Sequence, residues 1–251
     1  MLLDAAMGTR LIASGLDLDD DDPCLWNLAR PEPVAAIHRA DVAAGAEAVF
    51  TNTFGANRSW LARFDPKASV TAINRQAVTL ARLEAGPDRF VVGSIGPTAM
   101  VDPMTILEQA EALLDAGADA LALETYRFEQ AITALDHLKG IDHPILVGLF
   151  TWPDSIAATA HRLIDQGASV VGANCFADLD FAFRLIDELR ASDDRPFWLK
   201  PSTGPPDATL NPEDFARLAA RLASAGAGLL GGCCGTSDVH LGAIRDVWEN
   251  R

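Results

Sequence analysis

Four Gly-Ala pairs divide the sequence, and each one stands between a helical pattern and a short apolar run. They are Gly45-Ala46, Gly117-Ala118, Gly167-Ala168 and Gly226-Ala227. Glycine commonly ends a helix because it adopts the left-handed backbone conformation without a Cβ clash. The recurring order of helix, Gly-Ala and apolar run therefore indicates alternating helices and strands, which is typical of α/β proteins.

Eight short apolar runs occur along the chain, at residues 2–3, 48–50, 90–95, 120–123, 145–150, 170–172, 197–199 and 229–230. Such runs fit strands that are buried on both faces, as in a parallel sheet. Amphipathic patterns lie between them, and Asn211-Pro212 predicts the start of one such helix. Eight strand–helix units predict a single (β/α)8 TIM barrel over residues 1–251. An open doubly wound sheet is the alternative, but no Gly-x-Gly-x-x-Gly follows the first run.

The charge and the composition argue against several classes of partner. The formal net charge is −15, whereas nucleic acids and anionic membranes attract clustered Lys and Arg, so we expect neither as a partner. No apolar run reaches the roughly 18 residues of a membrane span, and the N-terminus does not resemble a signal peptide. Four cysteines, two of them adjacent, suit a reducing compartment, so we expect a cytoplasmic protein.

Polar residues follow most of the apolar runs. In a parallel barrel these positions gather on one rim, which carries the active site in enzymes of this class. The residues concerned are Asp4, Thr51, Asn52, Thr53, Ser94, Glu124, Thr125, Thr151, Trp152, Asn174, Cys175, Lys200, Cys233 and Cys234.

The adjacent cysteines Cys233 and Cys234 lie in a glycine-rich turn at 231–236. Neighbouring residues do not easily form a disulfide, but both thiolates can turn toward one metal ion, with Cys175 as a third ligand. Three thiolates and one open position are typical of a catalytic zinc site. A buried cysteine is commonly inert, yet three of the four cysteines at the ends of apolar runs favour zinc. Cys24 lies away from these ends, and we expect it to be an ordinary thiol.

Several longer motifs, taken together, resemble the homocysteine S-methyltransferase family. They span most of the chain and comprise residues 4–9, 37–38, 44–46, 51–57, 93–98, 124–125, 172–175 and 231–236. The motifs Thr-Asn-Thr-Phe-Gly-Ala-Asn at 51–57 and Gly-Ser-Ile-Gly-Pro-Thr at 93–98 resemble those of the methionine synthase branch in particular. The resemblance implies transfer of a methyl group to the thiolate of homocysteine, giving methionine, with zinc as cofactor and with Cys175, Cys233 and Cys234 as its catalytic ligands.

The resemblance also implies a set of substrate-binding residues. Asp4 and Glu124 take positions that hold the amino acid end of homocysteine, helped by backbone amides around Ala5 and Ala6. Asn174 lies beside a predicted zinc ligand, where it either donates to sulfur or ties down the turn. The chain departs from the family at Ala5, where glycine is usual, and this replacement narrows the backbone freedom beside the substrate's carboxylate.

The sequence does not determine the methyl donor. A corrinoid on a separate protein is one candidate, since the 251 residues contain no folate or cobalamin module; a sulfonium or betaine is another. Trp26, Trp60, Trp152 and Trp198 could contact an onium donor, although tryptophans at such spacings are more commonly core residues.

Two alternatives to a complete enzyme of this kind remain. One is a non-catalytic or partner-dependent homocysteine-binding subunit of a split methionine synthase. The other is a different barrel enzyme, which binds a substrate phosphate at Gly231-Gly232.

Overall fold

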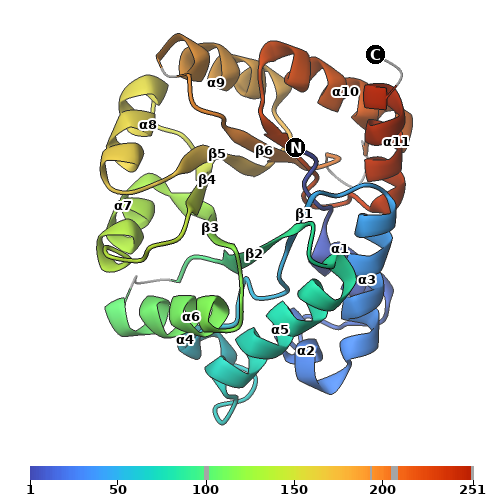
Figure 1. Cartoon of the computed structure of the whole chain (residues 1–251), viewed down its shortest axis with the longest axis vertical. Helices are drawn as coiled ribbons and strands as arrows, with labels where there is room; N and C mark the ends of the chain where they lie inside the picture. Colours follow the sequence, from blue (N-terminus) through green and yellow to red (C-terminus); the bar gives the residue numbers. More distant parts are fainter. Residues whose placement is uncertain (99–101, 193, 205–208, 250–251) are drawn as a thin grey trace.

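The computed structural model describes residues 1–98, 102–192, 194–204 and 209–249. In this part of the chain, seven parallel strands form one curled sheet in the order β1 to β7, with helices along its outer side (Figure 1). The strands are β1 (Ala48–Phe50), β2 (Phe90–Ile95), β3 (Ala120–Arg127), β4 (Ile145–Thr151), β5 (Val170–Phe176), β6 (Trp198–Pro201) and β7 (Leu229–Leu230).

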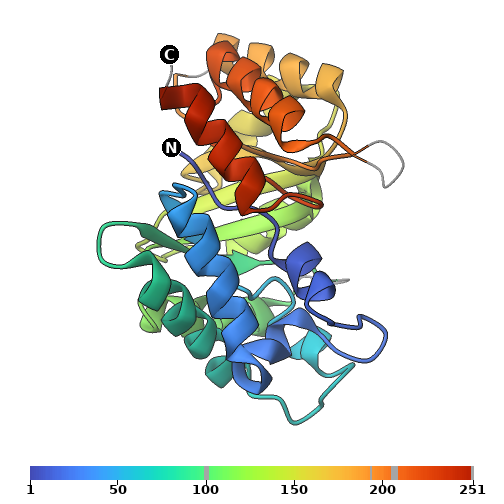
Figure 2. The same ribbon diagram turned by 90° about the vertical axis from the view of Figure 1, so that its right-hand side faces the viewer.

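Within the described ranges, each strand from β2 to β7 is followed by one helix, as the sequence predicts, whereas several helices precede β1 and two lie between β1 and β2. They are α1 (Met7–Ala13), the 3₁₀ turn η1 (Pro23–Leu25), α2 (Trp26–Ala29), α3 (Pro31–Ala43), α4 (Arg58–Leu61), α5 (Val70–Ala85), α6 (Pro103–Asp115), α7 (Phe128–His137), α8 (Ile156–Asp165), α9 (Leu179–Ser192), α10 (Pro212–Ala225) and α11 (Asp238–Glu249). Helices α10 and α11 lie side by side at the β7 edge of the sheet (Figures 1 and 2). Among the described residues, no helix is both long and apolar enough to span a bilayer.

The four Gly-Ala pairs end helices in the predicted way. Gly45, Gly117, Gly167 and Gly226 all have φ between 95° and 123°, in the left-handed region. The helix start predicted at Asn211-Pro212 is also confirmed, because the side chain of Asn211 accepts from a backbone amide in the first turn of α10, and Asp102 caps α6 in the same way.

The eighth strand predicted at residues 2–3 is not present as a strand. Leu2 forms an isolated parallel bridge with Leu230, and Leu3 forms another with Ala48. The segment therefore contacts both edge strands of the sheet, but with one residue for each neighbour it is too short to form a ladder. The amide of Leu3 donates to the carbonyl of Leu230 at 2.7 Å.

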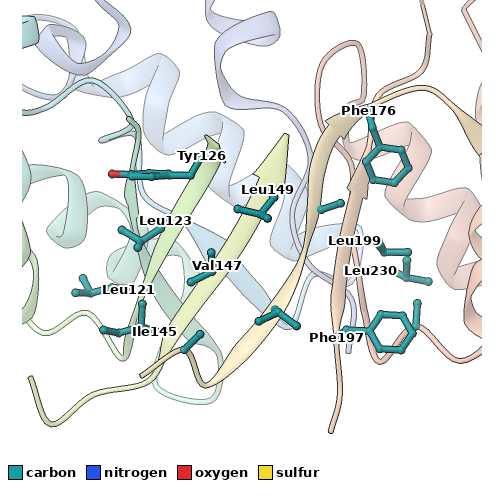
Figure 3. Close-up of a cluster of buried hydrophobic side chains, with 14 of the residues drawn as sticks. Leu121, Leu123, Tyr126, Ile145, Val147, Leu149, Phe176, Phe197, Leu199 and Leu230 are labelled. Atoms are coloured by element: carbon teal, nitrogen blue, oxygen red, sulfur yellow. The ribbon is translucent and has the colours of Figure 1, made fainter. Parts of the chain in front are cut away.

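Two apolar layers hold the sheet. One packs strand side chains such as Leu121, Val147 and Leu199 against the helices (Figure 3). The other lies on the face away from the helices and consists of Leu3, Ala48, Phe50, Val92, Ala120, Ala122, Leu146 and Trp198. Because side chains alternate along a strand, Glu124 and Lys200 continue this inner layer beyond Ala122 and Trp198.

Strands β3 and β5 extend further than the apolar runs predicted. The polar residues that were expected after these strands continue them through bulges, at the register shifts between Leu123 and Tyr126 and between Asn174 and Phe176. Thr125 (φ 65°) and Cys175 (φ 61°) occupy the left-handed region within these bulges. Bulges re-aim side chains near functional sites, and here the second bulge contains Cys175.

Gly172 provides a test of the inner packing. A Cβ added there would overlap the backbone carbonyl oxygen of Trp198, which cannot move aside as a side chain could. We expect Gly172→Ala to lower the free energy of unfolding by at least about 1–3 kcal/mol. Urea denaturation measures this change.

Gly242 in α11 is the matched control, because an added Cβ there meets nothing within 4 Å. Gly242→Ala should leave the stability unchanged or raise it by up to about 1 kcal/mol, since alanine favours a helix over glycine. Equal stability of the two variants would contradict the described packing.

Candidate active site

A cavity of about 500 Å³ opens at the carboxyl ends of the strands. Asp4, Glu124 and Lys200 line the part of the cavity that we call its floor. Cys175, Cys233 and Cys234 also line the cavity. All seven strands pair in parallel, so residues from distant parts of the sequence reach this one edge. Twelve of the fourteen predicted rim residues line this cavity, whereas Thr151 and Trp152 do not.

The three predicted ligand cysteines form one cluster. The Sγ atoms of Cys175, Cys233 and Cys234 all lie within 4.8 Å of one another, and those of Cys175 and Cys234 are 3.6 Å apart. Tetrahedral zinc with bonds of about 2.3 Å holds its sulfur ligands about 3.8 Å apart. The donor set and its spacing therefore fit a zinc ion, with one position left for another ligand.

The thiols of the cluster also influence each other's ionisation. Hydrogen bonds from Cys175 and then Cys233 lower the pKa of Cys234. Hydrogen bonds with Cys175 and then Cys234 raise the pKa of Cys233. The contacts within the cluster thus favour the thiolate of Cys234, and a thiolate is the form that a metal ion binds.

The glycine-rich turn places Cys233 and Cys234 through close backbone contacts. A Cβ on Gly232 would overlap the hydroxyl of Thr236, and that hydroxyl donates to the carbonyl of Cys233 at 2.7 Å. The amide of Cys233 donates to the carbonyl of Pro201 at 2.8 Å, which joins the turn to β6. His240 braces the turn, because its Nδ1 accepts from the amide of Ser237 at 3.2 Å.

Asn174 holds the neighbouring bulge in place. Its Oδ1 accepts from the amide of Thr125 at 2.9 Å, and its Nδ2 donates to the Thr125 hydroxyl at 2.8 Å. Of the two roles expected for Asn174, these contacts fit the one of tying down a turn. The sequence did not point to Thr125 as its partner, because the two residues are on different strands.

Asp4 is bound on both of its carboxylate oxygens. Oδ1 accepts from Lys200 Nζ at 2.7 Å, and Oδ2 accepts from the amide of Phe50 at 2.7 Å. Asp4 and Lys200 are only 2% and 5% exposed. Burial disfavours the charged form of Lys200, but Asp4 and Glu124 outweigh it and raise the pKa of the ammonium. The sequence indicated Lys200 only as one of the polar residues of the rim, with no role of its own.

Glu124 lies in the same floor with fewer partners. Its carboxylate accepts from the hydroxyl of Ser94, and the structure shows no ion pair within 4 Å between it and another described residue. Burial raises the pKa of Glu124, and the charge of Lys200 opposes that rise. Glu124 is therefore the floor carboxylate best able to receive a cationic group from the cavity.

The backbone amides predicted to bind substrate have acceptors within the chain. The amide of Ala5 donates to Asp41 Oδ2 at 3.4 Å, and that of Ala6 donates to Thr236 Oγ1 at 3.1 Å. The two terminal guanidinium nitrogens of Arg10 donate to the two carboxylate oxygens of Asp41, at 2.7 and 2.6 Å. This second ion pair supports the segment that carries Asp4.

The rest of the rim serves mainly to join elements. The hydroxyl of Thr51 accepts from the amide of Ser94, and Asn52 Nδ2 donates to the carbonyl of Pro23, so both residues link neighbouring elements. Trp60 lines the cavity, where the guanidinium of Arg63 lies 4.6 Å from its ring centroid. Trp26 and Trp198 are buried in the core, so the four tryptophans do not gather at one onium site.

Fold and site together define an α/β protein whose parallel strands present a three-thiol cluster beside a polar cavity. The sequence profile of the homocysteine S-methyltransferase family matches residues 1–248. The chain belongs to the homocysteine S-methyltransferase family.

Individual relatives agree with this assignment. The chain is 30% identical to the methionine synthase of Mycobacterium tuberculosis over 293 aligned positions, which cover 100% of this chain and 25% of that protein. The methionine synthase of Mycobacterium leprae is also 30% identical and is covered to 24%. The chain therefore spans about a quarter of the length of these curated relatives.

Solved structures of the homocysteine methyltransferase MmuM from Escherichia coli are similar over nearly their whole length. The metallated form has 26% identity and a TM-score of 0.80, with 98% of this chain and 96% of that chain covered. The oxidised form has 27% identity and the same TM-score, with 98% and 95% covered.

The buried pair of Asp4 and Lys200 leads to a stability prediction. Lys200→Met leaves an uncompensated carboxylate in the interior, and we expect it to lower the free energy of unfolding by about 3–5 kcal/mol. The double variant Asp4→Asn/Lys200→Met removes both charges and should lose much less. Chemical denaturation of the single and double variants tests this, with Lys139→Met as an exposed control; equal losses in the single and double variants would contradict it.

His38 leads to a pH-dependence prediction. It is fully buried in α3, neither ring nitrogen has a hydrogen-bond partner in the described chain, and burial lowers its pKa to about 4. In the unfolded chain the pKa of histidine is about 6.5. Between about pH 4 and pH 6.5 the unfolded state therefore binds a proton that the folded state does not. Stability from the neutral ring is therefore present above pH 6.5 and is lost as the pH falls toward 4.

His38→Met removes this dependence and leaves an apolar side chain. Between pH 7 and pH 5 the wild type should lose about 2 kcal/mol relative to the variant. The comparison of the two proteins is the relevant measurement, because burial raises the pKa of Asp41 to about 6 and acts in the opposite direction in both. Parallel pH curves from urea unfolding would contradict the prediction.

Proposed function

We propose that this chain is a zinc-dependent S-methyltransferase that moves a methyl group from a donor to the thiol of homocysteine, giving methionine. The observation that carries the proposal is the convergence of three cysteine Sγ atoms beside a cavity with a polar floor. Family membership and the similarity to proteins named methionine synthase and homocysteine methyltransferase support it.

Cys175, Cys233 and Cys234 would hold the zinc ion. A free thiol with a pKa of about 8.5 is mostly protonated at neutral pH. When bound, zinc supplies the acidity that releases the proton of the substrate thiol to solvent and keeps the sulfur nucleophilic. A general base on the chain is then unnecessary, and the protein's own residues bind and orient the two reactants.

The polar floor would hold the amino acid end of homocysteine. Glu124 accepts the substrate's ammonium, and the carboxylate of Asp4, which lines the same cavity, supports this end of the site through its ion pair with Lys200. The segment of Ala5 and Ala6 borders this end of the cavity, and Asn174 keeps the bulge beside Cys175 in its conformation. The substrate's sulfur is thereby directed toward the cysteine cluster.

The methyl transfer itself requires alignment. A sulfur–carbon bond forms while the bond between the methyl carbon and the donor breaks, and the donor leaves with that electron pair. Holding the two reactants in line contributes a large part of the rate enhancement in such reactions. The aromatic residues Phe54, Trp60 and Phe64, which also line the cavity, would contact the donor and exclude water from the reacting atoms.

The donor is either a small sulfonium or betaine, or a methylcorrinoid on a separate protein. Similarity to MmuM over nearly its whole length supports activity of this chain by itself. The match to only a quarter of the methionine synthases supports the alternative of a partner-dependent homocysteine-binding subunit.

We further infer that residues 1–251 form one homocysteine-binding domain whose sheet closes as a (β/α)8 barrel, with residues 2–3 as the eighth strand. The two parallel bridges of Leu2 and Leu3 to the opposite edge strands support this closure. The reduced thiols that the site requires suit the cytoplasm.

The direct test is turnover by the purified, zinc-loaded protein. Homocysteine is supplied with S-methylmethionine, betaine or methylcobalamin, and methionine is measured. We expect methionine from at least one donor, and a loss of at least about 100-fold with Cys234→Ser, because a zinc ligand is removed. Zinc content should fall in the same variant.

Cys24→Ala is the matched control for zinc content, because the sulfur of Cys24 is outside the cluster; it should keep the wild-type zinc content. Equal turnover by wild type and Cys234→Ser would contradict the metal role. Homocysteine binding without turnover from any donor would exclude the self-sufficient enzyme and favour the partner-dependent subunit.

A further inference from the structure

The carboxylate of an amino acid thiol needs a donor in this cavity, and the expected ones are already engaged. The amide of Ala6 donates to Thr236 Oγ1 at 3.1 Å, and the amide of Ala5 points to Asp41 Oδ2 at 3.4 Å. Asp41 is itself fixed by Arg10. Using these two amides for a substrate would mean breaking contacts that support the Asp4 segment.

The ammonium of Lys200 is the buried cation of the cavity lining, since Arg63, which also lines the cavity, is exposed and its guanidinium lies over the ring of Trp60. Its Nζ lies 2.7 Å from Asp4 Oδ1 and 4.1 Å from the ring centroid of Phe50. An ammonium has three N–H donors, and the structure shows one of them used on Asp4. Lys200 lines the cavity although it is 5% exposed, and the structure shows no second hydrogen bond from its Nζ to a described residue, which leaves donors for a group bound in the cavity.

Asp4 acts here as an anchor. Its two oxygens bind Lys200 and the amide of Phe50, so the side chain of Lys200 is held across the sheet from β6 toward β1. Glu124 lies in the same floor and accepts a hydrogen bond from Ser94. With Asp4 occupied, the floor offers one carboxylate and one ammonium, which is the charge pattern complementary to a zwitterion.

We propose that Lys200 binds the carboxylate of the thiol substrate and thereby makes the cavity specific for thiols that carry both an ammonium and a carboxylate group. The inference rests on the proposed function and adds a binding residue to it. Asp4 is then a positioning residue for Lys200, and Glu124 is the contact for the substrate's ammonium. A charge-assisted hydrogen bond of this kind is stronger than a neutral one, especially in a shielded site.

The test compares two thiols that differ only in the carboxylate. L-homocysteine and 3-aminopropane-1-thiol share the thiol, the chain length and the ammonium, and only the first has a carboxylate. Binding of each to the zinc-loaded protein is measured by titration calorimetry under reducing conditions. The quantity of interest is the ratio of the two dissociation constants, because general damage to the cavity affects both ligands and cancels.

The wild type should prefer homocysteine. In Asp4→Asn/Lys200→Met, which leaves no buried charge without a partner, we expect the preference to fall by about 10- to 100-fold, the effect of one hydrogen bond to a charged group. Lys200→Arg keeps a cation and should retain part of the preference. Lys139→Met, the same substitution at an exposed site, should leave the ratio unchanged.

An unchanged ratio in the double variant would overturn the proposal, and so would equal affinity of the wild type for both thiols. Either result leaves the proposed methyl transfer to homocysteine intact, since homocysteine still binds. A wild-type protein that binds neither thiol would instead contradict the proposed function, and the role of Lys200 with it.

Discussion

Parallel strand pairing is the constraint on which the whole site depends. Because the strands run in one direction, their carboxyl ends share an edge, and residues far apart in the sequence become neighbours there. Cys175 and Cys234 are 59 residues apart and their sulfurs 3.6 Å apart. Asp4 and Lys200 are 196 residues apart and form a buried ion pair. The bulge at Cys175 and the glycine turn at 231–235 then adjust this shared geometry locally.

The cavity combines two kinds of charge environment. At one side the thiols of the cluster share hydrogen bonds, so that one of them is poised as a thiolate. Lys200 pairs with Asp4 in the floor, and Arg10 pairs with Asp41 outside the cavity lining, so these ion pairs offset the cost of burial, whereas Glu124 has no ion pair within 4 Å among the described residues. A buried pair stabilises little by itself, but it fixes where a cation lies. The geometry thus suits recognition of a charged amino acid close to a metal-binding cluster.

Local signals in the sequence predicted a large part of this arrangement. Glycines such as Gly226 and apolar runs mark helix ends and strands, and strand ends alone are enough to bring the three cysteines together. The contacts of Asp4, Ala6 and Asn174 could not be predicted, because they depend on which side chain reaches across from another strand. Lys200 resembles an ordinary rim lysine in the sequence; its inward position follows only from its alternation with Trp198.

The central claim is that three cysteine sulfurs converge on one zinc ion that takes the substrate's sulfur as its fourth ligand. X-ray absorption at the zinc edge of the purified protein tests this most directly. The account predicts a shell of three sulfurs at about 2.3 Å with one lighter ligand, becoming four sulfurs when homocysteine is added. A shell dominated by nitrogen or oxygen, or one that homocysteine does not change, would contradict it.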